Sequence, residues 1–71
     1  MRSRDLTRAY SRMQFAEKLR RLADAIETGQ PFTIQVAGEK LRIPAAATFN
    51  IEHERHGTAE ELEFQLIWKR H

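Results

Sequence analysis

The chain has 71 residues, of which 41% are apolar and 31% charged, with a net charge of +2 and no cysteine. This composition is typical of one small soluble globular domain, for which we expect a small core and no large enclosed active site. The absence of cysteine excludes disulfides, thiolate nucleophiles and cysteine-based metal sites. No apolar run approaches the roughly 20 residues of a spanning helix, and the basic N-terminus lacks the apolar segment of a secretory signal, so we expect a cytoplasmic protein without membrane contact.

The charge is distributed unevenly along the chain. Residues 1–21 carry seven lysines and arginines against two acidic residues, a balance of +5, whereas residues 22–71 carry five against eight, a balance of −3. We interpret residues 1–10 as a basic N-terminal arm that is either disordered or adds a short edge strand through "DLTRAY". Residues 11–71 are expected to form a single domain.

The first predicted element is an amphipathic helix over about residues 12–28. Ser11 followed three residues later by Gln14 is the pattern of a capping box, and Gly29 with Pro31 beyond it is typical of a helix end. At 100° per residue, one narrow apolar stripe runs along this helix, made of Phe15, Leu19, Leu22 and Ile26.

Four segments follow in which apolar and polar residues alternate, a period typical of half-buried strands. The apolar positions, in chain order, are Phe32, Ile34 and Val36; Leu41 and Ile43; Phe49 and Ile51; and Leu62, Phe64, Leu66 and Trp68. Gly38 in "AGEK" and Gly57 in "RHGTAE" predict turns, and Pro44 ends the second strand because it cannot donate to a ladder.

One helix and four strands with short links favour a two-layer α+β domain. We expect the N-terminal helix to pack on one face of a four-stranded antiparallel sheet in meander order, with a core made of the helix stripe and all the alternating apolar positions. Trp68 has the same parity as Leu62, Phe64 and Leu66, so it is predicted to anchor one end of this core.

The order of these features resembles the amphi-Trp domain family, small bacterial and archaeal proteins named for an amphipathic strand leading to a C-terminal tryptophan. The resemblance covers about residues 11–68 and is carried by Ser11-Arg12, Ala16, Leu19, Leu22-Ala23-Asp24, Ile26, Gly29, Ile43-Pro44, Glu52, Glu54, Leu62-Glu63-Phe64 and Trp68. It implies the architecture and assigns no catalytic or binding residue. Gln65 departs from the pattern, where an acidic residue is expected.

Metal binding is the first chemistry to weigh. His53 and His56 are three residues apart, but a zinc site needs three or four convergent ligands, and Glu54 or His71 would have to join both histidines. A strand places His53 and Glu52 on opposite faces. We therefore expect no metal and no other cofactor.

Catalysis is not expected either. Ser11 is explained as a helix cap, the glycines are isolated turn residues rather than a phosphate-binding loop, and the acidic side chains suit a solvated strand face. These acidic residues are Glu52, Glu54, Glu61 and Glu63. Because no nucleophile, base and oxyanion donor are grouped around a pocket, we predict that the chain is not an enzyme.

Two binding classes remain. The preferred hypothesis is a non-catalytic interaction module, in which the free edge of the last strand, at Gln65 and Ile67, pairs with an unknown protein partner or with a second copy in a homodimer. The alternative is non-specific nucleic-acid binding, although only Tyr10 lies among the basic residues and the acidic strand face would repel phosphate. The candidate phosphate contacts are Arg2, Arg4, Arg8, Arg12, Arg20 and Arg21.

Overall fold

The computed structural model describes residues 8–70, and in this range one helix is followed by four strands. The elements are α1 (Arg12–Glu27), β1 (Phe32–Val36), β2 (Glu39–Ile43), β3 (Thr48–His56) and β4 (Ala59–Ile67). Within this described range, β1 pairs with β2 and β3 with β4, both antiparallel, as two separate two-stranded sheets. The predicted α+β class is confirmed, whereas the single four-stranded meander is wrong because β2 and β3 do not pair.

The helix ends are formed as the sequence predicts. The Gln14 backbone N–H donates to Ser11 Oγ at 3.2 Å, and the Ser11 N–H donates to Gln14 Oε1 at 3.2 Å, which completes the capping box. At the other end Gly29 adopts a φ of 67°, and the N–H of Gln30 donates to the carbonyl of Ala25 at 2.9 Å. This glycine therefore closes the helix in a left-handed conformation.

Both hairpins turn over two residues, but one turn carries strain. Val36 pairs with Glu39, so Ala37 and Gly38 form the loop, with φ of 50° and 80°. Positive φ at both positions corresponds to a type I′ turn, which favours asparagine followed by glycine. Ala37 adopts a left-handed conformation that an alanine side chain disfavours.

Replacing Ala37 with asparagine is therefore expected to stabilise the chain by about 0.5–1 kcal/mol, because asparagine tolerates the left-handed region. The midpoint of urea unfolding should rise by about 0.5 M or more, given a slope near 1 kcal/mol per M for a chain of this size. Gly38→Ala is the matched control, and its midpoint should fall. An unchanged midpoint for Ala37→Asn would contradict this account of the turn.

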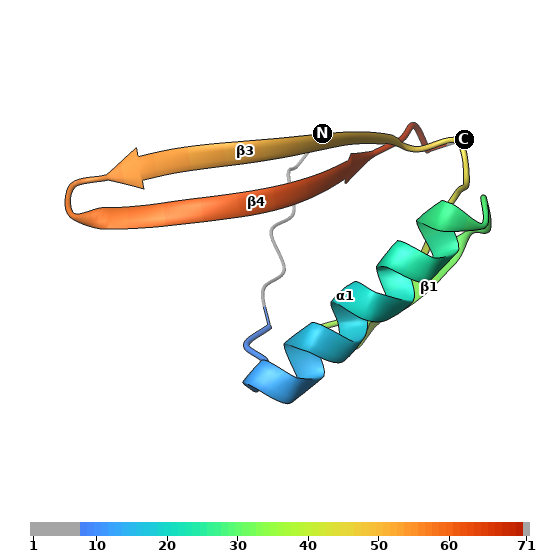
Figure 1. Cartoon of the computed structure of the whole chain (residues 1–71), viewed down its shortest axis with the longest axis horizontal. Helices are drawn as coiled ribbons and strands as arrows, with labels where there is room; N and C mark the ends of the chain where they lie inside the picture. Colours follow the sequence, from blue (N-terminus) through green and yellow to red (C-terminus); the bar gives the residue numbers. More distant parts are fainter. Residues whose placement is uncertain (1–7, 71) are drawn as a thin grey trace.

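The two hairpins belong to two arms that diverge from a common base (Figure 1). We call α1 with β1 and β2 the helix arm, and β3 with β4 the hairpin arm. In the helix arm, Arg21 Nη2 donates to the carbonyl of Thr33 at 3.1 Å, and its guanidinium lies 5.2 Å from the centre of the Phe32 ring. These contacts hold α1 against β1. Neither contact involves β3 or β4.

The core lies at the base of the two arms and is small. Phe32, Ile43 and Ala47 are buried, with 6–7% of their surface exposed. Partly buried apolar side chains pack against them, namely Leu22, Ala25, Ile34, Leu66 and Trp68. Ala47 belongs to the short link between β2 and β3, where its N–H donates to the carbonyl of Pro44 at 3.2 Å. The core therefore joins the link to both arms.

The predicted core was too large. Eight of its members are exposed: Phe15, Leu19, Ile26, Leu41, Phe49, Ile51, Leu62 and Phe64. Strand parity placed the hairpin-arm residues on one face correctly. Over residues 8–70, however, no helix packs directly over that face, because the hairpin arm does not join the sheet of the helix arm.

The start of the described chain contains no strand. Residues 8–10 precede α1 without regular structure, so the edge strand considered for "DLTRAY" is absent at its described positions. The rest of the N-terminal arm, residues 1–7, lies outside the described residues. Over residues 8–70, no helix is long and apolar enough to cross a membrane.

Candidate interaction surface

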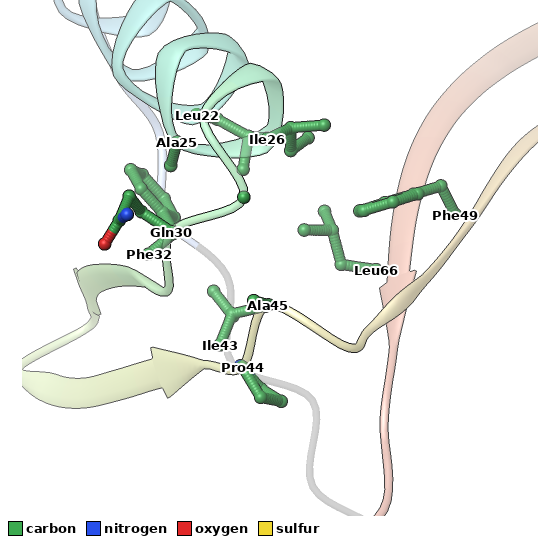
Figure 2. Close-up of a pocket in the computed structure, with 11 residues that line it drawn as sticks. Leu22, Ala25, Ile26, Gln30, Phe32, Ile43, Pro44, Ala45, Phe49 and Leu66 are labelled. Carbon is green, nitrogen blue, oxygen red and sulfur yellow. The ribbon is translucent and has the colours of Figure 1, made fainter.

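The most prominent feature of the surface is an apolar groove between the two arms. We call it the inter-arm groove and define it by its facing side chains, which are Phe15, Leu19, Leu22 and Ile26 of α1 and Phe49, Ile51, Leu62, Phe64 and Leu66 of the hairpin arm. Figure 2 shows its base, where Phe49 and Leu66 point from the hairpin arm toward Leu22 and Ile26 of the helix.

Three adjoining hollows make up the groove. The one at the base has a volume of about 80 Å³. A hollow of about 320 Å³ lies between Phe15 and Leu19 on one side and Leu62 and Phe64 on the other. Another, of about 380 Å³, separates Ile26 from Phe49 and Ile51. The two larger hollows are lined mainly by apolar side chains, as expected of a surface that contacts another apolar surface.

The register of the hairpin arm explains its apolar wall. Phe49 pairs with Leu66 and Ile51 with Phe64, so these four side chains share one face of the two-stranded sheet. Ile51 is 68% exposed and Phe64 is 61% exposed. Apolar side chains that are aligned on one face and open to solvent are the usual mark of a binding surface rather than of a core.

The helical wall follows from how α1 packs on β1. Leu22 and Ala25 contact the core, whereas Phe15, Leu19 and Ile26 are 42–56% exposed. At 100° per residue these three lie within about 40° of one another, beside Leu22 but turned away from Ala25. The stripe predicted to cover a sheet therefore faces the groove.

The apolar wall of the hairpin arm ends in a charged group near the turn. His53 Nε2 lies 2.7 Å from Glu60 Oε1, and Arg55 Nε donates to the same oxygen at 3.2 Å. His53 pairs with Leu62, and Arg55 with Glu60, on the face that carries Ile51 and Phe64. The apolar wall is therefore bounded by a polar group at the end nearest the turn.

The opposite face of the hairpin arm is acidic. Glu52 lies directly across from Glu63, and Glu54 from Glu61. Opposed like charges destabilise a strand pair, and Gln65 relieves one of these pairs, because its Nε2 donates to Glu52 at 2.8 Å and to Glu63 at 3.2 Å. An acidic residue at position 65 would lose both bonds and add a third carboxylate.

The two described histidines do not converge. His53 lies on the face toward the groove, whereas His56 lies on the acidic face, with Nε2 at 3.1 Å from Glu54 and 3.8 Å from Glu61. Among the described residues, two groups have ligand atoms close enough to share a metal ion, Glu54 with His56 and Glu61, and Glu52 with Glu54 and Glu63. Both groups lie at the surface on the acidic face of the hairpin arm, where Glu54 contacts His56 and where Glu52 and Glu63 accept from Gln65. His71 lies outside the described residues.

The candidate phosphate contacts are only partly described. Arg8, Arg12 and Arg20 are exposed, whereas Arg21 is engaged with β1. Tyr10 lies 5.2 Å from the Arg8 guanidinium and 5.9 Å from the Lys18 ammonium, and its hydroxyl donates to the carbonyl of Gln35 at 3.3 Å. Its ring therefore packs within the chain instead of offering a free stacking surface. Arg2 and Arg4 lie outside the described residues.

The predicted sheet edge lies beside the groove. In the described chain β4 has β3 on one side, so its other edge has no strand partner. Because a two-residue turn closes on a pair that exchanges both hydrogen bonds, the N–H groups of Gln65 and Ile67 are expected to face β3. The outward N–H groups then belong to Leu62, Phe64 and Leu66.

Sequence patterns did not reveal the groove or the burial of Ala47. The apolar residues of the groove were assigned to a core, and the link "PAAA" has no periodicity from which burial could be inferred. The number of large apolar residues relative to the length of the chain does indicate that some of them are exposed, because a domain this small buries a limited area.

Comparison with known proteins identifies a family. A family model described as the Amphi-Trp domain matches residues 5–71, nearly the whole chain. No curated protein matches the chain, and no solved structure matches it.

Proposed function

The chain belongs to the Amphi-Trp domain family, and we propose that it is a small non-catalytic interaction module. In this proposal it binds proteins through the wide apolar groove between its two arms. The observation that supports the proposal is the exposure of Ile51, Leu62 and Phe64 on one face, at 61–68%. Monomeric proteins seldom leave contiguous apolar patches of more than a few hundred Å² open to water.

Self-association is the simplest form of this activity. In the described chain the edge of β4 that has no strand partner adjoins the groove, so a strand of a second copy that pairs with this edge would extend the hairpin wall of the groove. In this proposal Gln65 and Ile67 lie next to the residues whose N–H groups point outward, and they do not themselves donate to the partner strand. Main-chain pairing would supply affinity, and the apolar pockets would supply specificity.

The proposal is tested by capture of proteins from lysate of the organism that encodes the chain, at low and high salt. The variants are Phe64→Ser, in the groove, and Glu61→Ser, on the acidic face of the same strand. Truncating an aromatic hot spot costs about 2 kcal/mol or more, so Phe64→Ser should recover roughly thirtyfold less partner, while Glu61→Ser recovers as much as the unaltered chain. Equal recovery by Phe64→Ser would exclude the groove as the binding surface.

The same experiment addresses nucleic-acid binding. Arg8 and Arg12 are exposed at the N-terminal end of α1, and Arg20 is exposed near its middle, which favours phosphate contact as the second candidate function. Binding of this kind is non-specific and depends steeply on salt. Nucleic acid recovered at low salt and lost at high salt, without a protein partner, would favour this alternative.

A further inference from the structure

We propose that the occupant of the inter-arm groove is a second copy of this chain, arranged so that the apolar face of each hairpin arm lies against the α1 stripe of the other copy. This inference rests on the proposed function and names its partner. The interface would be isologous, with each copy supplying the helical wall to one contact and the hairpin wall to the other.

The exposed apolar area is the size that a stable dimer needs. Between 42% and 68% of each of seven groove side chains is open to solvent, namely Phe15, Leu19, Ile26, Phe49, Ile51, Leu62 and Phe64. At about 200 Å² for a whole side chain, this leaves on the order of 800 Å² of apolar surface per copy, close to the contribution of one partner to a standard interface.

The two walls also match in length. The 16 residues of α1 span about 24 Å, and each nine-residue strand of the hairpin arm spans about 30 Å. A helix of this length can cover the apolar part of the hairpin face and leave the charged group of His53, Arg55 and Glu60 at the rim. No additional element is needed to complete the contact.

The charges of the two arms are complementary. The hairpin arm, residues 48–67, carries five glutamates against Arg55, a balance of −4. The helix arm with the residues before it, 8–43, carries seven lysines and arginines against four acidic residues, a balance of +3. Four of the five glutamates lie on the face of the hairpin arm that points away from the groove, so they act at long range and not across the contact. The opposite net charges favour the approach of helix arm to hairpin arm, and they disfavour the approach of either arm to its own kind.

The base of the hairpin arm explains why a second copy, rather than the chain itself, fills the groove. Leu66 and Trp68 pack against the buried cluster, Ala47 is part of that cluster, and Thr48 Oγ1 donates to the carbonyl of Ile67 at 3.3 Å. These contacts hold the hairpin arm at an angle to α1. Closing the groove within one chain would have to disrupt them, whereas a second copy leaves them intact.

The absence of cysteine allows a direct test. Leu19→Cys and Phe64→Cys are made in separate chains, one of them labelled with ¹⁵N, and the two are mixed and oxidised. Groups held in contact have effective concentrations near the millimolar range, so the disulfide-linked mixed dimer should exceed that of the control by roughly a hundredfold at micromolar protein. The control pairs Leu19→Cys with Glu61→Cys, which lies on the acidic face of the same strand.

Each outcome bears on the proposal. A mixed dimer linking positions 19 and 64, together with a dimeric mass of the unaltered chain in sedimentation, supports it. A disulfide that forms only within the double variant Leu19→Cys/Phe64→Cys would show a closed monomer and overturn it, as would cross-linking no greater than that of the control. A monomeric chain that still captures a different protein through Phe64 would overturn the dimer and leave the proposed function standing.

Discussion

Replacing Phe32 with alanine is expected to unfold most of the chain. Phe32 is 7% exposed and is the largest of the three buried apolar residues, and its ring also lies beneath the Arg21 guanidinium. Truncating a buried phenylalanine costs about 3–5 kcal/mol, which is comparable to the whole free energy of unfolding of a domain of this size. Loss of amide dispersion in NMR spectra and of cooperative thermal unfolding would be the measured results.

Phe49→Ala is the matched control for this prediction. It removes the same side chain from a position that is 53% exposed in the groove, so it should cost less than about 1 kcal/mol in dilute solution, where association contributes least. Similar losses for the two variants would contradict the assignment of the core to the base of the arms. A folded Phe32→Ala variant would contradict it as well.

Local signals explain why the elements could be predicted from the sequence. Ser11 and Gln14 each satisfy an N–H group within the first turn of the helix, and Gly29 is compatible with the left-handed conformation at its end. The alternation of apolar residues determines which side chains share a face of each strand. These relations depend on neighbours within a few residues, so the order and type of the elements were predicted correctly.

The arrangement of the elements depends on contacts that no local pattern encodes. Periodicity indicated that Phe49, Ile51 and Phe64 share a face, but it could not indicate what covers that face. A helix of the same chain and a helix of a second copy satisfy the same pattern equally well. The predicted single sheet assumed the first possibility, whereas the observed arms leave the face open.

The candidate site was predictable in its chemistry but not in its place. Alternation in the sequence indicated that the glutamates of the hairpin arm share one face, and the role of the basic residues and of the β4 edge stays a prediction. The groove was not, because its residues were counted as core. Eight exposed members of the predicted core show that the apolar surface of this chain exceeds what one copy buries. That excess is the physical link between the fold and the proposed association.

Trp68→Ala is expected to have the second largest effect, and it separates a role in the core from a role in binding. Trp68 follows β4, is half-buried and packs against the cluster of Phe32, Ile43 and Ala47. Because part of the indole is exposed, the loss should lie near the lower end of the range for buried aromatic residues, about 2–3 kcal/mol. The midpoint of thermal unfolding should fall steeply, and Trp68→Phe should restore much of the loss.

Ile67→Ala provides the contrast, because Ile67 is 50% exposed and lies on the acidic face. It should change stability by less than about 1 kcal/mol.

If Trp68 belongs to the core, its fluorescence should be shifted to the blue and should not change with protein concentration, because one copy already buries the indole against the cluster. A tryptophan at the interface would instead become shielded as copies associate, and its removal would leave a folded monomer. A stable, monomeric Trp68→Ala variant would therefore place Trp68 in the contact between copies and leave Phe32 and Ile43 to hold the base of the arms.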